Sequence, residues 1–313
     1  MSKDAKIKDI DQYLEDVYSC TARRELDKAL DLLDKAYSID FDSKIMGELF
    51  KMLRFWKERW ARLEDLASSY EKGDYLMNQW DQFLLWTEDR LTRRDDRGLQ
   101  ILKHMVHSAS LTYYEQLNSD ESDDQELCFR IGRCNKILGN YEKAASFLEK
   151  GARINKENPL VLAELADTYA LMDEMKGAKI FFREAFFINP QDIDLARLES
   201  GLIKKVIDKI QTTGLSNSML SEWLPVYAVI YGVFNVKREL RPIEYGKLRQ
   251  SIYSLQSDIR QDSEDEVLVP RLINRYFWLI DHYISIKEDR STIDEVLMNI
   301  KLLSPSIYQQ YIN

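Results

Sequence analysis

Residues 125–192 decide the fold: QELCFRIGRCNKILGNYEKAASFLEKGARINKEN is followed directly by PLVLAELADTYALMDEMKGAKIFFREAFFINPQD. The two windows, 125–158 and 159–192, each span 34 residues, and their small and apolar residues recur in register. A period of this length is typical of proteins built from repeated pairs of helices. The matching positions are Ile131-Gly132 with Leu165-Ala166, Ala144 with Ala178, Leu148 with Phe182, and Gly151 with Ala185.

The spacing of small residues predicts two antiparallel helices in each window. Helices approach closely only where the crossing point carries Gly or Ala, so we expect Gly132 to face Ala144 and Ala166 to face Ala178. Gly139-Asn140-Tyr141 suits the turn between two helices, because Gly ends a helix and Asn begins one. Pro159 and Pro190 stand at the window boundaries, where a helix start does not need the backbone N–H.

This pattern resembles the tetratricopeptide repeat (TPR) family, with departures at Asn135 and Lys156 in the first window. A further copy lies near the start of the chain, where the apolar and small positions are Tyr13, Val17, Cys20, Ala29, Leu33 and Ala36. The resemblance implies a right-handed superhelical array of helix pairs. In such an array the first helix of each pair lines a concave face.

Composition extends the all-helical prediction to the whole chain, since 313 residues contain only 11 Gly and 6 Pro. We expect three regions: 1–118 with degenerate repeats, 119–211 with the two clear repeats and a capping helix at 193–211, and 212–313 with further helices. A separate helical bundle is the alternative for the N-terminal part. The segment Thr212–Ser218 is the best candidate for a linker.

Within the N-terminal region, Lys44–Glu71 reads as one long helix carrying Phe55, Trp56 and Trp60, and Lys72–Tyr75 resembles the turn between paired helices. After that turn, large apolar side chains recur at the 3-to-4 spacing of a buried helix face. They are Trp80, Phe83, Leu84 and Trp86.

Charge and hydropathy argue against two classes of partner. The net charge of −9 would repel a phosphate backbone, so general nucleic-acid binding is not expected. The longest apolar stretch, 223–236, is too short to cross a bilayer, so we expect no membrane span.

The start lacks the apolar run of a secretory signal, and the three cysteines form no CxxC pair. We therefore expect a cytoplasmic protein.

No sequence motif for catalysis is present: phosphate loops, HExxH helices and nucleophile elbows are all missing. His104 and His107 are three residues apart and could face one metal ion, but no further ligand lies near them in sequence. The acidic run 119–126 lacks the ligand pattern of a calcium loop and reads better as a helix cap. We expect no enzyme activity, no cofactor and no metal.

The resemblance implies a partner-binding groove on the concave face of residues 125–211. Its basic side chains would suit an extended or helical protein segment that carries acidic groups. The implied groove residues are Phe129, Arg133, Lys136, Ile137, Leu160, Ala163, Asp167, Ala170, Leu171, Asp194, Arg197, Lys204 and Lys205.

Three functions remain open from sequence. The first is a scaffold or adaptor that binds a partner segment in this groove. The second is a structural homo-oligomer that assembles through array ends and through the aromatic C-terminal helices, which carry Trp223, Tyr227, Tyr231, Phe234, Tyr276, Phe277, Trp278 and Tyr283. The third is a metal protein or enzyme that uses His104 and His107.

Overall fold

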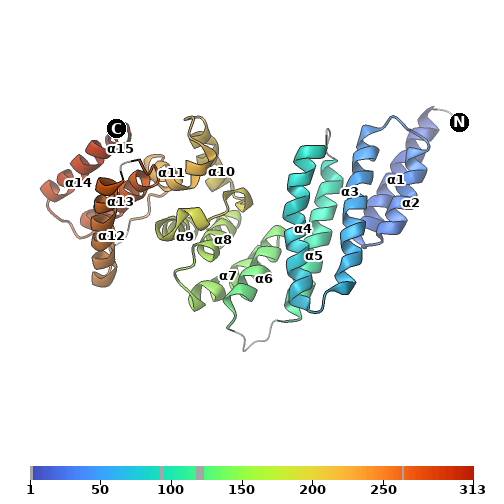
Figure 1. The fold of residues 1–313 in the computed structure, drawn as a ribbon, viewed down its shortest axis with the longest axis horizontal. Coiled ribbons are helices and arrows are strands. Elements are labelled where there is room, and N and C mark those ends of the chain that lie inside the picture. The colour runs from blue at the N-terminus through green and yellow to red at the C-terminus, as the bar shows by residue number, and fades with distance from the viewer. Residues whose placement is uncertain (1–2, 92–94, 118–122, 238, 263) are drawn as a thin grey trace. The chain divides into compact units, whose positions relative to one another are not determined.

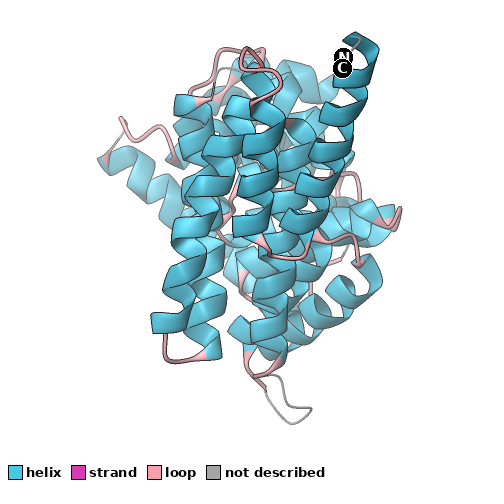
Figure 2. Cartoon of the chain, turned by 90° about the vertical axis from the view of Figure 1, so that its right-hand side faces the viewer, coloured by secondary structure: helices cyan, strands magenta, loops and turns pink. Residues whose placement is uncertain are grey.

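The computed structural model describes residues 3–91, 95–117, 123–237, 239–262 and 264–313. Within these ranges every regular element is a helix and no strand is present, as Figure 2 shows. Consecutive helices pack against one another in pairs. The all-helical, repeat-like fold class predicted from sequence is therefore confirmed. The chain forms two compact units, Met1–Ala144 and Ala145–Asn313.

The first unit packs its helices in chain order (Figure 1): α1 lies on α2, α2 on α3, α4 on α5, and α5 on both α6 and α1. The first helix pair buries the predicted small and apolar residues Val17, Cys20, Ala29, Leu33 and Ala36. The bounds are α1 Lys3–Ala22, α2 Leu26–Tyr37, α3 Lys44–Ala61, the 3₁₀ helix η1 Arg62–Asp65, α4 Ser69–Arg90, α5 Asp96–Glu115, α6 Gln125–Ile137 and, continuing past residue 144, α7 Tyr141–Ile154.

The predicted long helix 44–71 and the turn at 72–75 are wrong. The chain leaves the helix at Leu66, and α4 begins after Ser68, whose hydroxyl accepts the Glu71 N–H at 3.1 Å while the Glu71 carboxylate accepts the Ser68 N–H at 3.1 Å. This reciprocal capping box stops one helix run and starts another. Gly73 lies inside α4, where its missing side chain admits the ring of Tyr114 from α5.

The predicted buried face of α4 is correct only in part. Trp80 and Phe83 are buried, but Leu84 is 37% exposed. The buried positions run Leu76, Trp80, Phe83 and Thr87, in steps of four, three and four residues. This is the stripe that a helix presents to its neighbour, and Leu84 lies beside it rather than on it.

Gly73→Ala is expected to destabilise the protein by about 2 kcal/mol, because its Cβ would lie 2.6 Å from Cε1 of Tyr114. Tyr114 cannot easily move, since it is fully buried and its hydroxyl donates to Asp74 at 2.7 Å. Chemical unfolding followed by circular dichroism measures the change. Gly47→Ala in α3 is the control: no atom lies within 4 Å of the added Cβ, so a gain of about 0.5 kcal/mol is expected. Equal effects at the two positions would contradict the packing argument.

The second unit contains the second clear repeat and the C-terminal helices (Figure 1). Here α8 packs on α9, α10 on α11, α11 on α13, and α12, α13, α14 and α15 follow one another. The bounds are α8 Pro159–Leu171, α9 Met175–Ile188, the 3₁₀ helices η2 Pro190–Asp192 and η3 Leu195–Arg197, α10 Gly201–Gln211, α11 Asn217–Ile230, α12 Pro242–Gln261, α13 Leu268–Ser285, α14 Arg290–Leu303 and α15 Pro305–Ile312.

The same turn ends the first helix of both predicted repeats. Gly139 and Asp173, 34 positions apart, both adopt a positive φ, +81° and +64°. In each case the next N–H reaches back five residues: Asn140 donates to the Asn135 carbonyl at 2.9 Å and Glu174 donates to the Tyr169 carbonyl at 2.8 Å. This left-handed ending satisfies carbonyls that a helix end leaves free. The predicted small residues Gly132, Ala144, Ala166 and Ala178 are all buried.

The predicted continuous helix 193–211 is wrong. Two short 3₁₀ helices precede α10, which starts only at Gly201. The start is fixed by Asp167 of α8, whose carboxylate accepts the N–H groups of Glu199 at 2.8 Å and Ser200 at 2.9 Å. An anionic acceptor at this place satisfies N–H groups that otherwise lack a partner at a helix start.

Candidate partner-binding surfaces

The predicted groove residues on α6 differ in exposure. Phe129 is 7% exposed and Lys136 only 1% exposed, so both side chains lie in the interior. Arg133 and Ile137 are half-buried, and the Arg133 guanidinium lies 5.6 Å from the centre of the Phe129 ring. Of the four, Arg133 and Ile137 are therefore the side chains that solvent reaches.

Most of α8 is buried, because α9 and α10 both pack on it. Ala163, Asp167 and Ala170 of the predicted groove are among these buried residues. Asp167 is fully buried and holds the start of α10, as described above. Leu160, at the N-terminal end of α8, is 36% exposed, and Leu171 is half-buried.

The remaining predicted residues lie at η3 and on α10. Asp194 and Arg197 form a local ion pair at 2.6 Å, and Asp194 also accepts the Ala196 N–H at 3.2 Å. Lys204 and Lys205 are exposed on α10. In the second unit, the predicted positions open to solvent are therefore Leu160, Asp194, Lys204 and Lys205, with Leu171 and Arg197 partly open.

Sequence reasoning missed an open groove beside α9, which we call the α9 groove. It consists of a hollow of about 720 Å³ and a second one of about 250 Å³, which share Glu184 and Trp278 as lining residues. The larger volume is typical of ligand sites in proteins, and the smaller one lies just below that range. The lining residues are Lys156, Glu157, Lys176, Ile180, Arg183, Glu184, Phe187, Ile188, Val236, Lys237, Leu240, Arg241, Pro242, Ile243, Glu244, Lys247, Leu248, Trp278 and Asp281.

One wall of the α9 groove is formed by Val236, Lys237, Leu240 and Arg241, between α11 and α12, and hydrogen bonds hold this part of the chain at several points. The Leu240 N–H donates to Nδ1 of His282 on α13 at 3.1 Å. On the α9 side, Arg183 donates to the Val236 carbonyl at 2.6 Å and Lys179 to the Asn235 side chain at 3.1 Å. These bonds come from residues 42 to 56 positions apart, so no local sequence pattern could have revealed the wall.

A buried ion pair closes the floor of the smaller hollow. Arg183 donates to the carboxylate of Asp281, and the two side chains are only 5% and 10% exposed. The Arg183 guanidinium also lies 4.6 Å from the centre of the Trp278 ring. Burial raises the pKa of the Asp281 carboxyl, and the charge of Arg183 opposes that rise.

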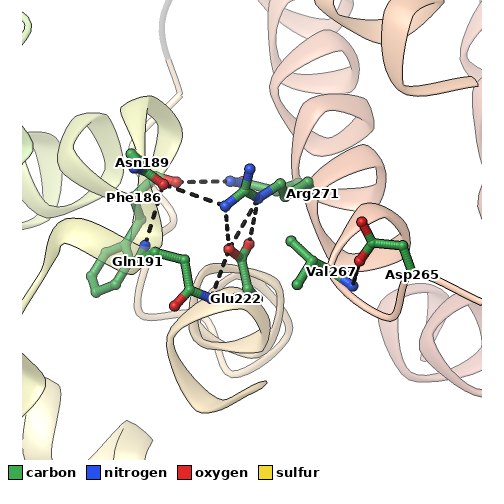
Figure 3. A network of polar contacts seen from close by, with 8 residues as sticks. Phe186, Asn189, Gln191, Glu222, Asp265, Val267 and Arg271 are labelled. Carbon is green, nitrogen blue, oxygen red and sulfur yellow. Dashed lines mark hydrogen bonds and ion pairs between the residues drawn. The ribbon is translucent and has the colours of Figure 1, made fainter. Parts of the chain in front are cut away.

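A second polar network joins α11, α13 and the end of α9 (Figure 3). Arg271 donates to Glu222 through Nε at 2.9 Å and through Nη2 at 2.5 Å, and Nη2 also donates to Asn189 at 3.3 Å. Gln191 donates to the same Glu222 carboxylate at 3.0 Å. The hydrogen bond to Glu222 raises the pKa of Arg271. The Glu222 side chain is fully buried, so the network provides the polar partners that this carboxylate requires.

The two histidines considered as metal ligands lie in different surroundings. His104 is exposed, whereas His107 is fully buried, with Nδ1 2.6 Å from the Lys103 carbonyl and its ring edge-on to Trp80. No group of three or more potential metal-binding side chains occurs in the described parts of the chain. In the acidic run, residues 119–122 lie outside the described residues, while Asp124 caps α6 by accepting the Leu127 N–H at 3.1 Å.

The C-terminal aromatic residues lie mainly in the interior of the second unit. Phe234, Tyr276, Phe277, Trp278 and Tyr283 are buried, and Trp223, Tyr227 and Tyr231 are half-buried. The exposed apolar side chains of α14 are Met298 and Leu302 instead. Among the helices that the structure describes, none has the length and apolar character needed to cross a membrane.

Comparison with known proteins finds a family model that matches part of the chain. Residues 137–202 match the model of the tetratricopeptide repeat, a range that includes all of α7, α8 and α9. A comparison with curated proteins finds no match. The resemblance drawn from the 34-residue period is thus confirmed by an independent family model.

Proposed function

We propose that this tetratricopeptide repeat protein is a scaffold or adaptor that holds a segment of another protein. The observation that carries the proposal is the family match at 137–202, because these repeats in general mediate protein–protein interaction. Tetratricopeptide repeats are typically non-catalytic, which agrees with a binding role.

The proposed contact residues are the predicted first-helix and α10 residues that solvent reaches, taken separately in each unit. In the second unit the apolar Leu160 and the basic Lys204 and Lys205 are exposed. In the first unit Arg133 and Ile137 are partly exposed. Apolar contacts with basic neighbours suit a partner segment that carries acidic groups.

The test is capture of partners from a native cell lysate, identified by mass spectrometry. Wild type is compared with Lys204→Glu/Lys205→Glu and, separately, with Arg133→Glu. Lys136 is left unchanged, because a charge reversal at a buried position would disturb the fold. We expect at least one protein to be captured by wild type and lost with a variant, since each reversal places like charges against an acidic partner.

Lys287→Glu/Lys301→Glu, which reverses two exposed charges outside the predicted groove, is the charge-matched control and should retain the partner. Equal capture by all proteins would contradict the proposed surface. Recovery of this chain alone, with a mass in sedimentation that falls on dilution, would favour the homo-oligomer, for which the exposed Met298 and Leu302 on α14 are candidate contacts.

A further inference from the structure

The α9 groove has more positive than negative side chains, although the chain as a whole carries a net charge of −9. Six lysines and arginines line it against four acids. Three of the cations are paired: Arg183 with Asp281, Arg241 with Glu244 at 3.1 Å, and Lys247 with Glu157 at 3.2 Å.

The other three cations, Lys156, Lys176 and Lys237, form no hydrogen bond or ion pair with any residue that the structure describes, but the charge of Lys237 acts on Asp281 and opposes the rise in its pKa. All three lysines are exposed. Lys156 lines the larger hollow, whereas Lys237 and Lys176, which lies near the start of α9, line the smaller one. Free ammonium groups on either side of a groove attract negative charge on whatever enters it.

The floor of the larger hollow is apolar. Phe187 and Trp278 pack with their ring centres 4.8 Å apart, and Leu240 and Leu248 line the same hollow. At the lip stands Ile243, which is 77% exposed. Together with the apolar floor, Ile243 extends the apolar surface that a bound segment would cover.

From these features we infer that the α9 groove binds an acidic amphipathic segment of a partner protein. Large apolar side chains of the segment fill the floor at Phe187 and Trp278, and its Asp or Glu side chains meet Lys156, Lys176 and Lys237. A segment fits better than a nucleic acid, because the groove lacks the continuous basic surface that a phosphate backbone requires and the chain repels polyanions overall.

This site is separate from the surface proposed above. The α9 groove is lined by the second helix of the repeat and by α12 and α13, whereas the proposed adaptor surface uses the first helices and α10. Either site can therefore fail in experiment without affecting the other.

The test uses a displayed library of random peptides of about 12 residues, a length that lets a helix present anchors at i, i+3, i+4 and i+7. The library is selected on the full-length chain. We expect enriched peptides to combine at least two large apolar residues with net negative charge. Hydrogen exchange with a bound peptide should show protection in 176–188 and 240–248.

Lys156→Glu/Lys237→Glu is expected to weaken these peptides by about tenfold or more, since attraction becomes repulsion at both hollows. Ile243→Asp should weaken them as well, and because Ile243 is exposed this change leaves the fold intact. Lys287→Glu/Lys301→Glu, which reverses the same number of exposed charges outside both proposed surfaces, should leave peptide affinity within about twofold, because screening limits the effect of distant charges.

Three outcomes would overturn the inference. One is enrichment of neutral or basic peptides, or of none at all. Another is undiminished binding of the acidic peptides to Lys156→Glu/Lys237→Glu. The last is protection of α8 and α10 in place of α9 and α12. Loss of lysate partners with Lys204→Glu/Lys205→Glu, by contrast, bears only on the adaptor surface.

Discussion

Arg271→Met is expected to lower the free energy of unfolding by about 3 kcal/mol, the lower end of the cost of removing one partner of a buried ion pair, because the Arg271 side chain is 32% exposed. The loss arises because Glu222, fully buried, would keep only the Gln191 hydrogen bond while retaining its negative charge. Met has a similar length and preserves much of the packing, so the lost charge dominates. Urea unfolding followed by circular dichroism measures the change.

Two controls separate the network from a general effect of removing arginine. Arg153→Met removes a 70% exposed side chain whose carboxylate partner is 3.9 Å away, and should cost less than about 0.5 kcal/mol. The double variant Arg271→Met/Glu222→Leu should recover much of the lost stability, because it removes the buried carboxylate that Arg271→Met leaves unpaired. A small effect of Arg271→Met, or no recovery in the double variant, would contradict the role assigned to the network.

Asp167→Ala is expected to cost about 3 kcal/mol, because two backbone N–H groups at the start of α10 lose an ionised acceptor in a buried place. Hydrogen exchange should locate the change: amides of α10 should exchange faster, while those of α1 to α3 should not. Asp167→Asn should fall between the wild type and Asp167→Ala, since the amide keeps one acceptor oxygen but loses the charge.

Asp194→Ala is the matched control for Asp167. Asp194 also caps a helical turn and also belonged to the groove predicted from sequence, but its side chain is 47% exposed, so a loss below about 1 kcal/mol is expected. If Asp167→Ala reduced partner capture without reducing stability, Asp167 would act as a contact residue and not as a cap.

The burial of Asp167 and Lys136 restricts where a partner can bind. Sequence reasoning placed Asp167 and Lys136 on an open groove, because the family pattern puts those positions on the first helices. In the structure both side chains are buried, and Asp167 is engaged by Glu199 and Ser200 of the same chain. The α9 groove, in contrast, shows no periodic signature, since its walls come from four separate segments.

The sequence by itself determined the features that depend on residues close along the chain. The 34-residue period, the buried Gly132 and Ala166, and the turn at Gly139 all follow from helix periodicity and backbone preference, so they were predictable. Even so, Gly73 shows a limit of such reasoning. A glycine can end a helix or admit a neighbouring ring, and only the position of Tyr114, 41 residues away, distinguishes the two.

Only the tertiary structure decided which polar groups meet. Asp167 reaches Ser200 across 33 residues, Arg271 reaches Glu222 across 49, and Arg183 reaches Asp281 across 98. These separations follow no regular period along the sequence, because each contact depends on how whole helices pack and not on the periodicity of a single helix. For the same reason the α9 groove and its three lysines Lys156, Lys176 and Lys237 could not be predicted from the sequence, since they are brought together only by the packing of the second unit.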